Sequence, residues 1–173
     1  MTPPPYAIGI DTSLTGLREA DDLLRDIAAD VGFPEDAFGC THLVRDGDRP
    51  RVALSLAAGS EAVVEAVRAR LTSQGYRVTE GAWDHAGRAV LYPGAAALTG
   101  TLTVAELVSR SAIERVRVLG RPDGPDPATR LVTREFVRPQ WQDGELVLAA
   151  MPAVGGTLVP FEVPDPTPCC ADH

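Results

Sequence analysis

Two stretches in the first half of the chain carry apolar residues at helical spacing. Over residues 17–31 the apolar side chains recur every three or four positions, and Gly32 follows as a stop signal. A second such stretch covers residues 62–71, with Ser60 placed to cap its first turn. The spacing predicts two amphipathic helices, each with one apolar face that needs a partner.

Short segments rich in β-branched and aromatic residues surround the two helices. They predict strands at residues 6–10, 41–44, 52–56, 76–79 and 88–92. Two helices with one apolar face each are accommodated most simply on the same side of one antiparallel sheet. We therefore expect an α+β fold over residues 5–95, a ferredoxin-like split βαβ sandwich.

The pattern changes after a connector of small residues. Thr103 and Glu106 form a capping-box motif that predicts a short helix ending near Arg110. Alternating apolar and polar positions then predict strands at residues 115–119, 130–137, 145–149 and 157–163. We expect residues 96–163 to form this short helix and a small antiparallel β meander packed on the first part. The proline-rich residues 164–173 are expected to form an extended tail.

Charge and composition exclude several functions. The 173 residues carry a net charge of −8, which disfavours binding to nucleic acid or to anionic membranes. All 16 basic residues are arginine, and the chain contains neither lysine nor asparagine. Without lysine there is no phosphate-loop lysine and no Schiff base to pyridoxal phosphate, so we expect no nucleotide or pyridoxal cofactor.

The sequence contains no recognisable targeting segment. The first residues lack the basic and apolar regions of a secretory signal, and no stretch approaches the roughly 18 apolar residues of a membrane span. We therefore expect a cytoplasmic protein that does not associate with membranes. Thiols are kept reduced in that compartment, so the three cysteines are expected to serve as thiols or metal ligands.

The cysteines and two of the three histidines fall in two short windows. Cys40 and His42 form one window, and Cys169, Cys170 and His173 form the other. Thiolate and imidazole are the preferred ligands of zinc and copper(I), and a tetrahedral site needs four of them. Side chains two positions apart on a strand point to the same face. The leading hypothesis is therefore a small non-catalytic accessory protein that binds zinc or copper(I) through Cys169, Cys170 and His173, with Cys40 or His42 as the fourth ligand.

Other interpretations of the same cysteines remain open. Cys40 also fits a small buried hydrophobic residue, the common role of an isolated cysteine. Cys169 and Cys170 also fit an end of the chain without a function, or the reactive thiols of a thiol-dependent enzyme or redox protein. The spacing matches no established zinc motif, because adjacent cysteines must bend the backbone to face one ion.

An arginine-rich segment supports a further alternative. Residues 110–138 contain seven arginines and four acidic residues, a net charge of +3 in an acidic chain. Solvated faces account for such a run, but so does an interaction module that uses the sheet and this segment to bind a protein or small ligand. Under that alternative, a protein partner contacts either the arginine-rich segment or the tail.

Overall fold

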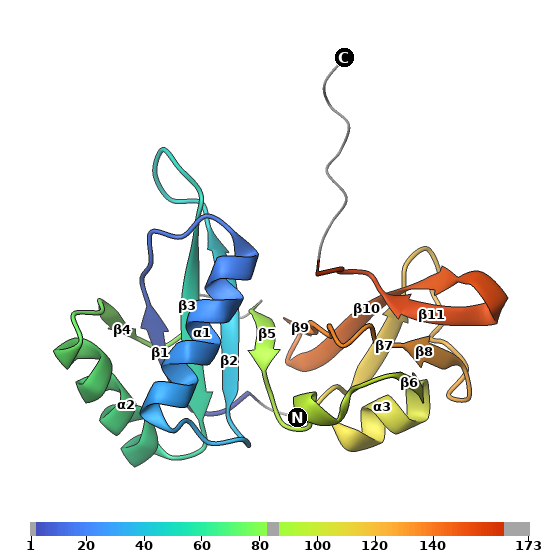
Figure 1. Cartoon of the computed structure of the whole chain (residues 1–173), viewed down its shortest axis with the longest axis horizontal. Helices are drawn as coiled ribbons and strands as arrows, with labels where there is room; N and C mark the ends of the chain where they lie inside the picture. The colour runs from blue at the N-terminus through green and yellow to red at the C-terminus, as the bar shows by residue number, and fades with distance from the viewer. Residues whose placement is uncertain (1–2, 83–86, 165–173) are drawn as a thin grey trace.

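A computed structural model describes residues 3–82 and 87–164 (Figure 1). The first half contains β1 (Tyr6–Ile10), α1 (Leu17–Val31), β2 (Phe38–Val44), β3 (Arg51–Ala58), α2 (Glu61–Ser73), β4 (Val78–Glu80) and β5 (Arg88–Leu91). The second half contains η1 (Ala95–Ala97), β6 (Thr101–Thr103), α3 (Val104–Arg110), β7 (Arg115–Val118), β8 (Arg130–Val132), β9 (Gln140–Gln142), β10 (Glu145–Ala153), η2 (Val154–Gly156) and β11 (Thr157–Pro160).

The three predicted α-helices are present, and their ends lie within about two residues of the predicted ends. Helix α1 covers residues 17–31 and ends at Gly32, whose left-handed φ of 64° suits glycine. The side chain of Ser60 accepts a hydrogen bond from the backbone of α2. Thr103 and Glu106 form the predicted capping box of α3, in which each side chain bonds to the other residue's backbone N–H.

The strands of both halves form one mixed sheet. Its order is β4-β1-β3-β2-β5-β9-β10-β11-β8-β6, and β7 pairs with β10 outside this path. Figure 1 shows two groups of strands that meet at β5 and β9. Arg88 pairs with Gln140 at this junction, and Ala89 N donates to Pro139 O at 2.8 Å. Few backbone contacts therefore join β5 to β9, although the sheet is continuous across this junction.

The predicted fold class, a ferredoxin-like sandwich of residues 5–95 followed by an antiparallel meander, is wrong. The chain has three helices and an eleven-stranded mixed sheet that runs through both halves. Strand β7 lies parallel to β10, and β8 lies parallel to β11. Alternation in a sequence indicates which side chains of a strand are buried, but it specifies neither the partner strand nor its direction.

The domain limits at residues 95 and 163 stay a prediction. The sequence does not predict the three-residue strands β6 and β9, because such short strands show no clear alternation of apolar and polar residues. The predicted strand at residues 130–137 is also shorter, since β8 ends at Val132. The tail predicted at residues 164–173 lies outside the described residues except for Pro164.

Two apolar clusters occupy the two faces of the first half of the sheet. Leu54 and Leu56 of β3 face α1 and α2 in one cluster. Phe38 and Cys40 of β2 belong to the other cluster, together with Trp141 and the interior of the second half. Side chains alternate along a strand, so Phe38 and Cys40 lie on the face opposite the two helices. This second face carries the candidate site.

Candidate functional site

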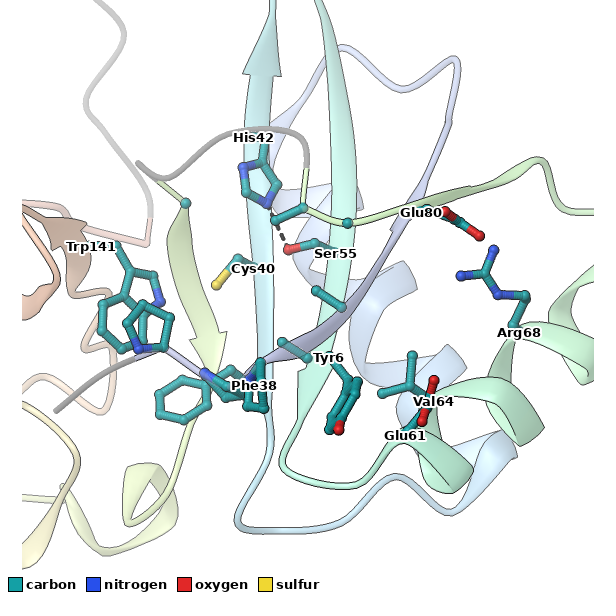
Figure 2. A pocket seen from close by; sticks show the side chains of 18 of the residues that line it. Tyr6, Phe38, Cys40, His42, Ser55, Glu61, Val64, Arg68, Glu80 and Trp141 are labelled. Carbon is teal, nitrogen blue, oxygen red and sulfur yellow. Dashed lines mark hydrogen bonds between the residues drawn. The ribbon is translucent and has the colours of Figure 1, made fainter.

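Polar side chains are buried on the sheet face opposite the helices. Cys40 of β2 is the register partner of Ser55 on β3, and His42 pairs with Ala53 one step along. Cys40, His42 and Ser55 are each at most 5% exposed. All three line the floor of a cavity of about 620 Å³ (Figure 2). Ala57, two positions after Ser55 on β3, also lines this cavity. We call this space the sheet-face cavity.

The imidazole and the hydroxyl on the cavity floor are hydrogen-bonded. His42 Nε2 lies 2.7 Å from Ser55 Oγ, and the tautomer of the ring decides which group donates. Both residues sit on rigid neighbouring strands, so the pair is held in a defined orientation. The floor therefore offers a ligand hydrogen-bonding groups within a largely apolar surface.

A close backbone approach shapes one wall of the cavity. Gly87 lies directly against the β2 side chains, and a Cβ placed on it would be 2.7 Å from His42 Cε1 and 2.9 Å from Cys40 Cβ. Real Cβ contacts are longer, so glycine is required for this approach. Trp141 N donates to Gly87 O at 3.1 Å, which connects β9 to the same wall.

Aromatic side chains form one end of the cavity. The rings of Phe38 and Trp141 are 5.3 Å apart between centroids and tilted by 52°, a favourable aromatic geometry. Residues 3–5, all prolines, also line the cavity. A ligand reaching the aromatic end would meet rigid apolar surface.

Charged side chains form the other end, where the cavity passes the edge of the sheet. Strand β4 pairs with β1 from Ile8 to Ile10, so within the described strands the start of β1 at Tyr6 forms the edge. The cavity reaches α2 and the end of β4 here. The charged lining residues are Glu61, Glu65 and Arg68 of α2 and Glu80 of β4.

The structure describes two of the five predicted metal ligands, and the metal site stays a prediction. Cys40 and His42 both line the floor of the sheet-face cavity, because their side chains lie on the same face of β2 as their spacing predicts. Cys169, Cys170 and His173 lie outside the described residues. Within residues 3–82 and 87–164, no group of three or more histidine, cysteine, aspartate or glutamate side chains could hold a metal ion. The role of Cys169 and Cys170 as reactive thiols likewise stays a prediction.

The arginines of residues 110–138 are spread over several elements. Arg110 pairs with Glu106 at 3.1 Å, and Arg115 pairs with Glu145 at 2.9 Å. Arg138 is buried and donates to Asp21 at 2.9 Å. At least three of the seven arginines thus form ion pairs within the chain, two of them at the surface. The buried Arg138 is unsuitable as a contact for an external partner.

A buried ionic cluster joins elements that are distant in sequence. The guanidinium of Arg88 donates to Asp21 of α1 at 2.5 Å and to Glu162, which follows β11. Burial by itself would lower the pKa of Arg88, but the bonds and charges of Glu162 and Asp21 outweigh it and raise this pKa. Burial lowers the pKa of Arg138 despite the opposing effect of Asp21.

A second cavity of about 380 Å³ lies beside this ionic cluster. It is lined by Arg138 and Glu162 of the cluster, by Leu17 of α1 and by residues of β7, β9 and β10. Arg138 is bonded to Asp21 and Glu162 to Arg88, and Arg117 of β7 is a third charged residue of the lining. The second cavity is smaller than the sheet-face cavity, and two of its three charged lining residues already have structural partners.

Sequence reasoning missed Ser55 and Trp141 as cavity residues. Ser55 stands between Leu54 and Leu56 in a strand that is otherwise apolar. A hydroxyl in a buried strand needs a hydrogen-bond partner, and this signal could have marked it. Nothing in the sequence indicates that Trp141, about a hundred positions from Cys40, lies at the same cavity.

None of the described helices is long and apolar enough to cross a membrane. Comparisons with protein-family models, with curated proteins and with solved structures found no match. The sheet-face cavity is therefore the feature of the chain that points to a function.

Proposed function

We propose that this protein binds a small molecule in the sheet-face cavity, without catalysing a reaction on it. The observation that carries the proposal is the cavity of about 620 Å³, which combines an aromatic end with a hydrogen-bonded His42–Ser55 pair. Small-molecule sites have volumes of roughly 300–1,000 Å³ and a mainly apolar lining with a few polar groups. The cavity has both properties.

The backbone around Ser55 favours binding over catalysis. A serine activated by histidine also needs donors for the oxyanion that forms during acyl transfer, and these are commonly backbone N–H groups. Ser55 lies in the middle of β3, where it pairs with Gly9 of β1 on one side and with Cys40 of β2 on the other. Backbone donors at this point belong to the sheet ladder, so the hydroxyl is better suited to hold a ligand.

Filling the cavity tests this proposal. Ala57→Phe adds a ring to the cavity lining, and Val154→Phe is the control because Val154 is 97% exposed and outside this lining. A fragment library is screened against the ¹⁵N-labelled protein by heteronuclear NMR. We expect fragments that shift the amides of Cys40, His42 and Ser55 in the natural chain and in Val154→Phe. These shifts should disappear in Ala57→Phe.

Circular dichroism and the dispersion of the amide chemical shifts in the NMR spectrum show whether Ala57→Phe remains folded. If this variant misfolds, the smaller change Ala57→Leu takes its place. If fragments bind a folded variant with a filled cavity just as tightly as they bind the natural chain, the proposal is contradicted. A library without any hit at these amides would contradict it equally.

Binding of a soft metal ion is the second candidate, and one observation favours it. Cys40 Sγ and His42 Cε1 both lie within 3.3 Å of the position that a Cβ on Gly87 would take. Cys169, Cys170 and His173 would supply the remaining donors. Zinc chloride is therefore an additional titrant in the same NMR experiment. Equimolar binding that is lost on deletion of residues 169–173 supports this candidate, and the absence of zinc-dependent shifts contradicts it.

The proposal includes a location in the cytoplasm. A thiol such as that of Cys40 stays reduced there. Protein partners at the arginine-rich segment or at the tail are a separate hypothesis, which the small-molecule proposal does not require.

A further inference from the structure

The two ends of the sheet-face cavity differ in chemistry. Phe38 and Trp141 occupy one end, and Glu61, Arg68 and Glu80 occupy the other (Figure 2). The buried His42–Ser55 pair lies between them. An elongated ligand therefore meets apolar surface at one end, a hydrogen-bonding pair in the middle and charged groups at the far end.

The charged end has an excess of carboxylates. Three glutamates and one arginine line it. Arg68 Nε donates to Glu65 Oε1 at 3.1 Å, an ion pair within α2. Among the described residues, Glu61 and Glu80 take part in no ion pair. After the pairing within α2, two negative charges remain at this end of the cavity.

Both carboxylates are exposed at the surface, and a helix dipole acts on only one of them. Glu61 is in the first turn of α2, where a negative charge stabilises the positive end of the helix dipole. Glu80 ends the edge strand β4, where no helix dipole acts on it. Both side chains line the same end of the cavity, although they come from different elements.

We propose that the ligand of the sheet-face cavity is a cationic amphiphile, an aromatic or aliphatic body that carries a protonated amine. The apolar body packs against Phe38 and Trp141, and the ammonium group lies near Glu61 and Glu80. This inference rests on the proposed function, because it specifies the ligand of the same cavity. The net negative charge of the chain acts in the same direction, since it attracts cations over longer distances.

Three probes that differ only in their end group test the inference. They are 4-phenylbutylamine, 4-phenylbutan-1-ol and 5-phenylpentanoate, and their affinities are measured by calorimetry and by NMR titration of the full chain. We expect the amine to bind about fivefold more tightly than the alcohol, which is the size of effect that partly exposed charge pairs produce. The carboxylate should bind most weakly. Raising the salt concentration should reduce the preference for the amine.

The double variant Glu61→Gln/Glu80→Gln removes both negative charges. It should reduce the affinity for the amine to that for the alcohol and leave the affinity for the alcohol unchanged. Glu35→Gln/Glu135→Gln is the matched control, because it changes the net charge equally at exposed positions outside the cavity lining. This control should keep the preference for the amine.

The outcomes separate this inference from the proposed function. Equal binding of amine and alcohol, or tighter binding of the carboxylate, overturns the inference and leaves the cavity a ligand site. A preference for the amine that survives Glu61→Gln/Glu80→Gln also overturns it. If none of the three probes shifts the amides of Cys40, His42 and Ser55, both this inference and the binding function of the cavity are contradicted.

Discussion

Single side chains decide the chemistry of the sheet-face cavity. Cys40 and His42 can be placed on one face of a strand from sequence alone, because side chains alternate along a strand. Ser55 completes the floor only because β3 pairs with β2 in the register that sets it opposite Cys40. A shift of one residue would turn Ser55 toward the helices.

The pKa of the Tyr92 hydroxyl is controlled by the core that surrounds it. Tyr92 is 4% exposed, and its hydroxyl donates to Val137 O at 3.0 Å. Burial raises the pKa of Tyr92 above its ordinary value, and the charge of Arg138 opposes this only in part. The phenol consequently stays protonated in the folded chain at a pH where it ionises in the unfolded chain.

We predict two effects of Tyr92→Phe on stability. At neutral pH the loss of the hydrogen bond to Val137 should lower the free energy of unfolding by about 1 kcal/mol. Above about pH 10, unfolding of the natural chain releases a proton that the folded state retains, so its stability falls as the pH rises. The variant lacks this contribution and should show a shallower decline. Urea unfolding at pH 7, 9 and 10.5 measures both effects, and parallel declines would contradict the second.

At the scale of elements, the buried ionic cluster and its hydrogen bond to β2 hold five segments together. Asp21 of α1 accepts from Arg88 of β5 and from Arg138, which precedes β9, and Glu162 after β11 accepts from Arg88. Thr41 of β2 also accepts from Arg88, at 3.2 Å. None of these partners lies within 40 positions of Arg88 in the sequence, so local patterns give no sign of the cluster.

We predict that Arg88→Met destabilises the chain far more than the same change at an exposed arginine. Arg88→Met removes the bonds of Asp21 and Glu162 to Arg88, but Asp21 keeps its bond to Arg138. The loss should therefore be large but stay below the roughly 3–5 kcal/mol that it costs to leave a buried charge without any partner. Arg70→Met is the control, because Arg70 pairs with Asp30 on the surface, where solvent screens the charges. Urea unfolding of both variants at pH 7 provides the comparison. Equal, small effects would show that the cluster is not a stabilising connection.

At the scale of the whole molecule, two groups of strands share a sheet and an apolar core. The cluster that contains Phe38 and Cys40 of the first half also contains Leu146 and Leu148 of β10. The ionic cluster adds a second connection between the halves, on the side of α1. Neither half buries these surfaces without the other.

These shared contacts predict that the two halves unfold together. Amide hydrogen exchange should give the same opening free energy, within about 1 kcal/mol, for Leu54 in β3 and Leu148 in β10, because both amides then exchange through global unfolding. Native-state exchange at several low urea concentrations measures these values. A lower opening free energy throughout residues 96–163 would instead show that the second half opens independently.

The sequence by itself determined the local features of this protein. Helical spacing, Ser60, Gly32 and the Thr103–Glu106 motif act within a few residues, so the three α-helices and their ends can be deduced without a tertiary structure. The position of Cys40 and His42 on one face of a strand can also be deduced locally, because it follows from their spacing of two residues.

Only the tertiary structure decided the strand partners, the single mixed sheet and the sheet-face cavity. Parallel pairing of β7 with β10, the approach of Gly87 to His42 and the position of Trp141 depend on contacts between distant segments. Alternation along a strand is the same whichever strand lies beside it, because it records only the burial of each face. Pairing is settled when the whole core is packed, and the cavity exists only after that step.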